Sequence, residues 1–283
     1  MRVGYLGPPG TFAEEALIAL VGDLDDHDAV PLPGVVDTFE AVRSGEVPNA
    51  LVPIENSIEG SVTQTLDQLA FVQPTLFLQA EVVHRIRHHL IVRRGVRVAD
   101  VRQVISHPQA TAQCQGFLRR ELPGVPLAAS HSTAEAVRLV SATEEPWAAI
   151  GTLRAAELYE AEVVADDIAD VSDNRTRFVM LGREEAPAEG PGRFRTSIVC
   201  MLDRDRPGAL LAILQEFAMR AVNLSRLESR PAKTGLGRYV FFIDIEGSAQ
   251  RDLPVSAAIT AIEQQGVADV LMLGAYAVMD PSA

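Results

Sequence analysis

Strand-like and helix-like patterns alternate along the first two thirds of this chain. Residues 101–107 have the apolar composition of a buried strand, and Pro108 fits the first turn of the helix that follows. Residues 147–151 predict another strand, which leads into a helix from about Thr152. Because alternating strands and helices pack as largely parallel sheets covered by helices, this pattern predicts an α/β fold.

A change of composition at residues 183–193 divides the chain. This segment is rich in proline, glycine and charged residues, which are typical of linkers. Beyond it, the patterns follow the order strand, helix, strand, strand, helix, strand, which is the ferredoxin-like βαββαβ arrangement. Since 283 residues are too many for one small domain, we predict one domain over residues 1–182, a linker over 183–193 and a second domain over 194–283.

The net charge of −13 and the isoelectric point near 4.9 narrow the class of ligand. A nucleic-acid-binding protein usually carries a basic face, so we expect no nucleic-acid partner. A small anionic substrate is still compatible, because a local cluster of arginines can reverse the field inside a cleft. The two cysteines, Cys114 and Cys200, are far apart in sequence, which disfavours a disulfide or a zinc site. No segment is apolar and long enough for a signal peptide or a membrane span, so we expect a soluble, cytoplasmic protein.

Four polar loops are expected where ligands gather in α/β proteins, at the carboxyl ends of strands and the amino ends of helices. Any one of them alone is typical of a loop that only caps a helix. Four in one α/β region, without a metal-ligand pattern, favour a cleft for a small polar molecule. Their sequences are GPPGTF at 7–12, PIENSIEGSV at 53–62, SHPQAT at 106–111 and NRTRF at 174–178.

The last of these loops has two guanidinium groups beside a hydroxyl at the start of a strand. A guanidinium binds a carboxylate through two parallel hydrogen bonds. On an extended strand, Arg175 and Arg177 point to one face and Thr176 to the other. The alternative is that one of the arginines forms a surface ion pair that contributes little.

Histidine and cysteine side chains offer further reactive groups. His84, His88 and His89 lack the acid or cysteine partners of a recognisable metal site, so we expect hydrogen-bonded or solvated roles and no metal. His107 is expected at a strand-to-helix junction, where it could act as an acid or base, cap the helix or orient a substrate. Cys114 is expected to be a buried thiol.

Taken in order, the four loops closely resemble the prephenate dehydratase family. The matching segments span nearly the whole first domain and are GYLGPPGTF, PIENSIEGSV, SHPQA and NRTRFVMLG. RPGALLAIL and LESRP in the second domain resemble the ACT regulatory domain of that family. No chorismate mutase segment precedes residue 1, so the monofunctional form is expected.

The resemblance implies a two-lobed region of the periplasmic binding protein type II kind, followed by a ferredoxin-like ACT domain. The first lobe would comprise about residues 1–75 and 160–182, and the second about residues 76–155. The substrate would lie in the cleft, with GPPGTF, ENS and TRF from one lobe and SHPQA from the other.

The resemblance also implies the activity of a decarboxylating hydro-lyase in L-phenylalanine biosynthesis. Prephenate would lose water and carbon dioxide to give phenylpyruvate, and aromatisation would drive this without a metal or redox cofactor. By this resemblance Thr176 donates to the departing hydroxyl, Arg177 pairs with a carboxylate and Phe178 packs behind the site. The substrate-binding residues that it implies are Thr11, Asn56, Ser57, Ser106, His107, Gln109 and Ala110.

For the ACT domain the resemblance implies an allosteric L-phenylalanine site, at an interface within a homodimer or homotetramer. Binding there would bias the conformers of the dehydratase cleft, typically by ~1–3 kcal/mol. An ordinary strand end is the alternative for the ESRP segment. The implied residues are Gly208, Ala209, Leu210, Asn223, Leu224, Glu228, Ser229, Arg230 and Pro231.

Two alternative functions are also compatible with the sequence. The same chemistry could act on arogenate, in which an amino group replaces the keto oxygen of prephenate. A non-catalytic amino-acid sensor could also combine a binding-protein fold with an ACT domain. The Thr176 hydroxyl argues against a sensor, which has no need of a donor at that position.

Overall fold

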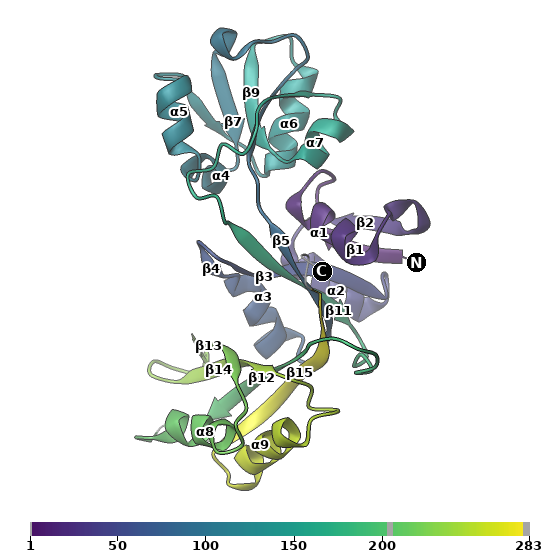
Figure 1. The fold of residues 1–283 in the computed structure, drawn as a ribbon, viewed down its shortest axis with the longest axis vertical. Coiled ribbons are helices and arrows are strands. Elements are labelled where there is room, and N and C mark those ends of the chain that lie inside the picture. The colour runs from purple at the N-terminus through teal and green to yellow at the C-terminus, as the bar shows by residue number, and fades with distance from the viewer. Residues whose placement is uncertain (1, 203–205, 280–283) are drawn as a thin grey trace. The chain divides into compact units, whose positions relative to one another are not determined.

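The computed structural model describes residues 2–202 and 206–279. The chain forms two compact units, and each collects segments that are far apart in sequence (Figure 1). The first unit comprises residues 1–38, 51–62 and 83–178, and the second comprises residues 39–50, 63–82 and 179–283. These units divide the chain differently from the sequence domains 1–182 and 194–283, since residues 39–50 and 63–82 belong to the second unit.

The first unit begins with a strand, a helix and a parallel strand. β1 (Arg2–Leu6) and β2 (Asp28–Leu32) pair in parallel along their whole length. Helix α1 (Phe12–Val21) connects them, together with a short 3-10 turn, η1 (Leu24–Asp26). β1 also neighbours β3 (Asn49–Asn56), whose end pairs with the short strand β4 (Gly60–Ser61).

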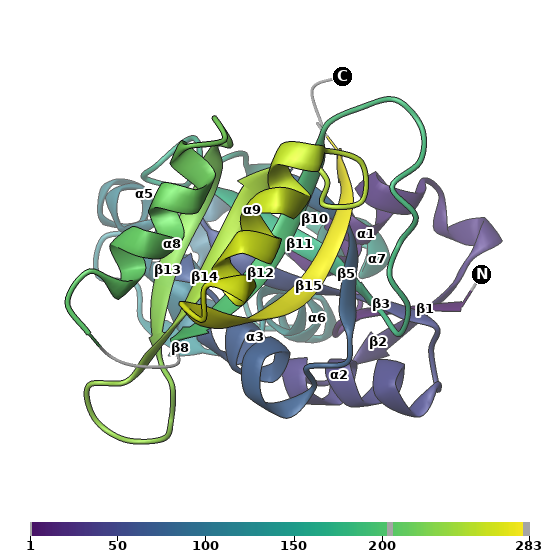
Figure 2. The same ribbon diagram turned by 90° about the horizontal axis from the view of Figure 1, so that it is seen from below.

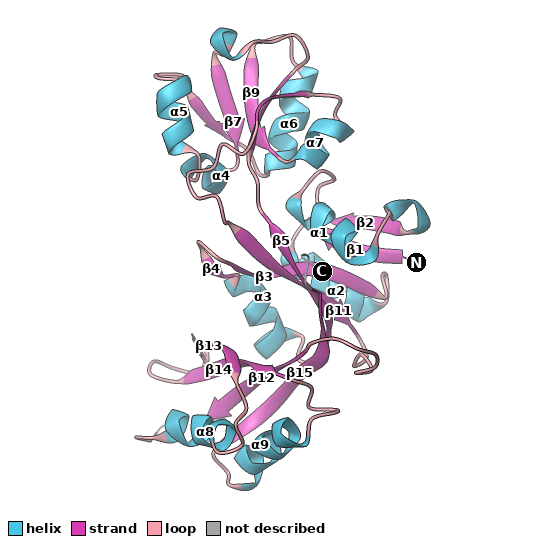
Figure 3. Cartoon of the chain, in the orientation of Figure 1, coloured by secondary structure: helices cyan, strands magenta, loops and turns pink. Residues whose placement is uncertain are grey.

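A five-stranded sheet in the order β10-β6-β9-β7-β8 also belongs to the first unit. Its strands β7 and β9 are labelled in Figure 3. One cluster of buried apolar side chains contains Leu90 and another contains Ile91. Because neighbouring strand residues point to opposite faces, the two clusters cover the two faces of this sheet. Its elements are β6 (His89–Val92), η3 (Val98–Asp100), β7 (Gln103–Ser106), α4 (Pro108–Ala112), α5 (Gln115–Glu121), β8 (Leu127–Ala129), α6 (Thr133–Ala142), β9 (Trp147–Gly151), α7 (Leu153–Leu158) and β10 (Glu162–Ala165).

The return of the chain to the first lobe comes later than the sequence predicts. β10 pairs antiparallel with β6, with Glu162 opposite Val92, and so belongs to the five-stranded sheet. Val164 and Ala165 pack against the buried cluster that contains Leu90, which explains why this segment stays with that sheet. The return strand is therefore β11 (Arg175–Gly182) alone, and the expected start near residue 160 is wrong.

The second unit contains the predicted βαββαβ succession, which is confirmed. Its sheet has the order β13-β14-β12-β15-β5, with antiparallel pairs except where β15 pairs in parallel with β5. The predicted domain end at 280–283 lies outside the described residues. The elements are β12 (Phe194–Leu202), α8 (Ala209–Ala218), β13 (Leu224–Pro231), β14 (Tyr239–Glu246), α9 (Leu253–Gln264) and β15 (Ala268–Met279), joined by β5 (Phe77–Arg85).

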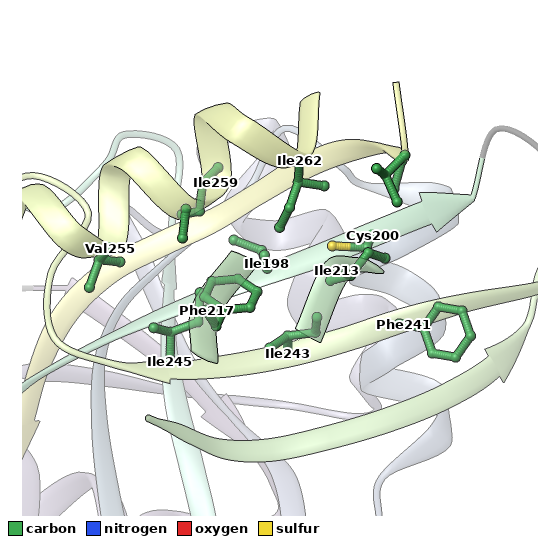
Figure 4. Packing of buried hydrophobic residues seen from close by; sticks show 13 residues of the cluster. Ile198, Cys200, Ile213, Phe217, Phe241, Ile243, Ile245, Val255, Ile259 and Ile262 are labelled. Atoms are coloured by element: carbon green, nitrogen blue, oxygen red, sulfur yellow. The ribbon is translucent and has the colours of Figure 1, made fainter. Parts of the chain in front are cut away.

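Helices α8 and α9 lie on the same face of this sheet (Figure 2). Ile213 and Phe217 of α8 and Ile259 of α9 pack against Ile198 and Ile243 of the strands (Figure 4). These apolar residues recur at the three- and four-residue spacing of a helix face and at the two-residue spacing of a strand face. The mixed α/β fold class predicted from the sequence is therefore confirmed in both units.

The helical segments not yet described lie between residues 35 and 72. These are α2 (Val35–Ser44), α3 (Thr63–Asp67) and a π-helical turn, η2 (Gln68–Val72). In the ranges that the structure describes, no helix has the length and apolarity needed to span a membrane.

Candidate active site

A cavity of about 470 Å³ in the first unit collects residues from all four polar loops. It contains five of the seven expected substrate-binding residues and two of the three expected catalytic residues. These are Thr11, Asn56, His107, Gln109, Ala110, Thr176 and Phe178. Segments separated by more than a hundred residues thus contribute to one pocket, as the sequence led us to expect.

Asn56 at the end of β3 is held in one orientation by its own loop. Its Oδ1 accepts hydrogen bonds from the backbone N–H groups of Ile58 and Glu59, both at 3.0 Å. The Nδ2 group therefore points the other way, where it donates to Thr176 Oγ1 at 2.9 Å and to Asn174 Oδ1 at 2.8 Å. The asparagine thus presents a fixed donor to the threonine hydroxyl.

Thr176 is 8% exposed and lines the cavity, while its neighbour Arg177 does not. The Arg177 side chain is also buried, with its Nε 3.7 Å from Glu55 Oε2. Successive residues of β11 point to opposite faces, so Thr176 and Arg177 cannot both face the same cavity. The structure thus places Arg177 beside Glu55, whereas a contact with a substrate carboxylate was expected.

Arg175 and Phe178, at the two ends of this motif, differ in exposure. Arg175 is exposed, and its Nε donates to Asp173 Oδ1 at 2.7 Å, which is the surface ion pair considered as the alternative. Phe178 is 3% exposed and lines the cavity, as expected for a wall residue.

His107 caps the short helix α4. Its Nδ1 accepts a hydrogen bond from the backbone N–H of Gln109 at 3.3 Å. In the neutral ring, the proton must then reside on Nε2, so His107 has a donor left for a ligand. Gln109 and Ala110 line the cavity beside it.

Thr11 lines the cavity at the start of α1, but the capping box that its spacing to Glu14 suggests does not form. The Thr11 hydroxyl donates to Leu6 O at 3.0 Å instead of capping the helix. The buried Glu14 accepts from the backbone N–H of Gly10 and from Arg154 Nε, the latter at 3.0 Å. Glu14 thus fixes the loop that precedes Thr11 through its link to α7.

Two expected substrate-binding residues lie away from the cavity. Ser106 is fully buried, and its hydroxyl donates to Ile150 O at 2.7 Å. Ser57 is exposed, and its hydroxyl accepts from the backbone N–H of Arg175 at 2.9 Å. Both hydroxyls therefore form hydrogen bonds within the protein, whereas contacts with a ligand were expected.

A polar chain that sequence reasoning missed lies along the wall of the cavity, since Asn174, Gln113 and His88 all line it. Asn174 Nδ2 donates to Gln113 Oε1 at 2.9 Å, and His88 Nε2 lies 3.0 Å from the same oxygen. Burial lowers the pKa of His88 below its usual range, and the neighbouring His89 acts in the same direction. Gln113 could have been suspected, because it lies one helical turn after Gln109.

The α6 end of the cavity was also missed. His131, Ser132 and Thr133 line it, and the three-residue spacing of Ser132 and Glu135 is typical of a capping pair. That pair does cap the helix, since Glu135 N donates to Ser132 Oγ at 3.0 Å. The N-termini of α1 and α6 therefore contribute to the lining, as that of α4 does.

Neutral groups line the cavity in place of the local cluster of arginines that the sequence made possible. In the part of the chain that the structure describes, the lining contains no lysine or arginine. Amide, hydroxyl and imidazole groups and helix N-termini, which favour anions, take their place. Among the described residues, no group of histidine, cysteine and acidic side chains could hold a metal ion.

Residues 3–186 match the family model of prephenate dehydratase, and residues 196–258 match that of the ACT domain. A prephenate dehydratase of Mycobacterium marinum is 41% identical over 282 residues, which cover 97% of this chain and 88% of that protein. The chain belongs to the prephenate dehydratase family.

Solved structures of similar proteins extend the comparison. A prephenate dehydratase from Arthrobacter aurescens, crystallised in complex with L-Phe, has a TM-score of 0.88 and 38% identity, over 98% of this chain and 90% of that one. A protein described as a quorum-quenching acylase, GqqA, has a TM-score of 0.85 and 27% identity, over 99% of this chain and 98% of that one. Proteins named for different activities thus share the fold, so the function must be argued from the site.

The residues expected to bind L-phenylalanine in this prephenate dehydratase family member lie on two elements of the second unit. Gly208, with a φ of 85°, immediately precedes α8, and Ala209 and Leu210 form its first turn. Asn223 directly precedes β13, on which Leu224 and the ESRP segment lie at the edge of its sheet. Arg230 Nη2 is 3.3 Å from Asp67 Oδ1, and Lys233 Nζ is 2.7 Å from Asp67 Oδ2.

Proposed function

We propose that this protein converts prephenate to phenylpyruvate in L-phenylalanine biosynthesis. The prephenate dianion takes up one proton and gives the phenylpyruvate monoanion, carbon dioxide and water. As the ring C–O bond breaks, the electron pair of the bond to the ring carboxylate completes the aromatic ring. The observation that carries this proposal is the hydrogen bond from Asn56 Nδ2 to Thr176 Oγ1 inside the cavity.

That hydrogen bond decides the direction in which the Thr176 hydroxyl donates. Its oxygen accepts from Asn56, so the single hydroxyl hydrogen is available to another acceptor. The oxygen that leaves the prephenate ring is such an acceptor. Because an aliphatic hydroxyl is too weak an acid to ionise at neutral pH, Thr176 donates a hydrogen bond or relays a solvent proton. One donor of this kind contributes roughly 3–4 kcal/mol to stabilisation of the transition state.

The two carboxylates of prephenate bind, in this proposal, to neutral donors and helix N-termini. His107 supplies an Nε2–H group, and Gln109 supplies an amide beside it. Thr11 and Ser132 lie at the amino ends of α1 and α6, where backbone N–H groups favour an anion. Weakly charged donors bind the ring carboxylate without trapping it, which favours its departure as carbon dioxide.

Arg177 acts in this proposal as a support for the strand that carries Thr176. Its burial beside Glu55 anchors the first residues of β11 from the face opposite the cavity. Phe178 forms the apolar wall against which the ring lies.

We further propose that residues 1–182 form the catalytic domain, residues 183–193 the linker and residues 194–283 an ACT domain that binds L-phenylalanine. The edge position of β13 supports pairing with a second copy, as a homodimer or homotetramer. L-phenylalanine, the product of the pathway, would then inhibit the enzyme by binding at the start of α8 and at β13. A cytoplasmic location agrees with a biosynthetic enzyme of this kind.

The direct test incubates the purified protein with prephenate, without added metal, and follows phenylpyruvate by its ultraviolet absorbance. The proposal predicts turnover of prephenate above that of arogenate. Faster turnover of arogenate would reassign the substrate. No turnover of either substrate, together with binding of an aromatic amino acid, would favour the sensor.

A further inference from the structure

We infer that His88 is a positioning residue for this dehydration, holding Gln113 so that Asn174 and Asn56 stay aligned on the Thr176 hydroxyl. This inference rests on the proposed function of the cavity and adds to it a residue that does not react.

The amides of the chain have a single consistent orientation. Gln113 Nε2 donates to Glu59 Oε1 at 3.4 Å, which turns Gln113 Oε1 toward Asn174 and His88. Asn174 Nδ2 donates to that oxygen, which in turn leaves Asn174 Oδ1 to accept from Asn56. Each amide thus fixes the next, and rotation of one would set two like groups against each other.

His88 completes the chain, and it lines the cavity together with Gln113 and Asn174. Since Gln113 Oε1 is an acceptor, the His88 Nε2 atom 3.0 Å away must carry the proton that it donates. The His88 Nδ1 atom is buried and has no hydrogen-bond partner among the described residues. A proton on Nδ1 would therefore be a buried donor without an acceptor, which the folded state disfavours.

The surroundings of the ring favour the same neutral form. The ring packs edge-to-face on Phe12, with 5.4 Å between centroids, and is 3% exposed. Burial and His89 lower the pKa of His88, which outweighs the opposite effects of the Gln113 hydrogen bond and of Asp167. His88 is therefore a neutral Nε2–H donor near neutral pH, where its hydrogen bond to Gln113 is present.

His89 provides a matched control within the same segment. It is 4% exposed, nearly as buried as His88. Its Nδ1 lies 3.1 Å from Asp166 Oδ1, away from the polar chain. A substitution at His89 therefore removes a buried histidine of the same type without touching Gln113.

The kinetic test compares His88→Leu, His88→Gln and His89→Leu in the full-length protein. His88→Leu should lower kcat about tenfold, the factor for loss of one positioning hydrogen bond, with KM within about threefold. In His88→Gln the amide of the new glutamine can donate to Gln113, so this variant should retain most of the parent kcat. His89→Leu should lower the melting temperature without lowering kcat.

A cycle with Gln113→Ala isolates the positioning path. Once Gln113 is truncated, adding His88→Leu should lower kcat by no more than about twofold, since the two residues act in series. Full additivity of the two losses would overturn the inference. Unchanged kcat in His88→Leu, with the parent active on prephenate, would also overturn it and leave the proposed function intact.

A spectroscopic measurement tests the ring state without any activity. Nitrogen NMR of the ¹⁵N-histidine-labelled protein should show His88 as one neutral tautomer, protonated on Nε2, from about pH 6 to pH 8. Titration of His88 within that range, or protonation on Nδ1, would overturn the inference. A parent protein inactive on prephenate would remove the proposed function and the inference with it.

Discussion

The side-chain amide of Asn56 donates to the hydroxyl oxygen of Thr176 across 2.9 Å, although 120 residues separate the two in sequence. The Asn56 Oδ1 atom is occupied by two backbone N–H groups, so the amide cannot turn round. The threonine hydroxyl is therefore an acceptor toward the protein and a donor toward the cavity. The proposed reaction depends on this direction of hydrogen-bond donation more than on any single charge.

Asn56→Asp reverses that polarity with little change of shape. The new carboxylate still accepts from the backbone N–H groups, but its second oxygen faces Thr176 Oγ1 and attracts the hydroxyl hydrogen. We expect kcat for prephenate to fall by about a hundredfold or more. Steady-state assays of phenylpyruvate formation give this value. The control is Ser57→Ala, outside the cavity, which should stay within about threefold of the parent. Equal losses in the two variants would contradict the assignment.

Glu14→Ala should destabilise the first unit. It leaves the Arg154 guanidinium and the Gly10 N–H without their shared partner, in a site where Glu14 is 4% exposed. We expect a loss of about 1.5–3 kcal/mol in the free energy of unfolding, measured by urea denaturation. Glu121→Ala, which removes an exposed pair with Arg120, should leave that free energy nearly unchanged. A Glu14→Ala protein as stable as the parent would show that this link does not hold the loop.

The two cysteines should make stability fall in alkaline solution. Burial raises the pKa of Cys114 and of Cys200 to about 12 in the folded protein, from an ordinary value of 9.0. The folded state then retains thiol protons that the unfolded chain releases. Their contribution is fully present below about pH 9 and is lost progressively as the pH rises toward about 12.

Urea denaturation between about pH 7 and pH 10 measures this slope. Replacing both residues by alanine should reduce the decline above about pH 9 while lowering stability at neutral pH. An unchanged slope in the double variant would assign the alkaline loss to other groups.

Ser229→Ala and Arg230→Ala should weaken inhibition by L-phenylalanine while prephenate turnover persists. Ser229 lies on β13, and Arg230 links this strand to Asp67. We expect the half-inhibitory concentration to rise by about fivefold or more, within the usual range of allosteric coupling. Arg251→Ala, outside the expected binding residues, is the control. If both β13 variants respond to L-phenylalanine like the parent, the site lies elsewhere.

The sequence predicted the parts of the site that have a local signature. The Thr-Arg-Phe and Glu-Asn-Ser motifs, and His107 before a helix that begins with proline, follow from short segments read alone. Their convergence in one cavity follows from the α/β pattern, because loops at equivalent ends of strands come together. The roles of Thr176 and Phe178 came from the resemblance to the prephenate dehydratase family, and both residues line the cavity.

Positions that depend on which face of a strand is turned to the cavity were predicted poorly. Arg177 was expected to bind a carboxylate, although strand alternation already placed it opposite Thr176. Ser106 ends β7, and its hydroxyl bonds to Ile150 O on β9, a pairing that sequence cannot reveal. Family motifs name these residues without saying in which direction their side chains point.

The polar chain was missed for a related reason. Asn174 and Gln113 are 61 residues apart, and His88 and Gln113 are 25 apart, so no local pattern joins them. Each is an ordinary residue in its own segment. Their alignment exists only in the folded protein.

The hydroxyl of Thr176 is the centre of this account, and its removal is the most direct measurement. Thr176→Ala should fold like the parent yet convert prephenate to phenylpyruvate about 10²–10³-fold more slowly, whereas Thr176→Ser, which keeps the hydroxyl, should recover much of the rate. Circular dichroism and thermal unfolding verify the fold of both variants. Parent-like turnover in Thr176→Ala would contradict the account, because the departing hydroxyl would then need no donor from this strand.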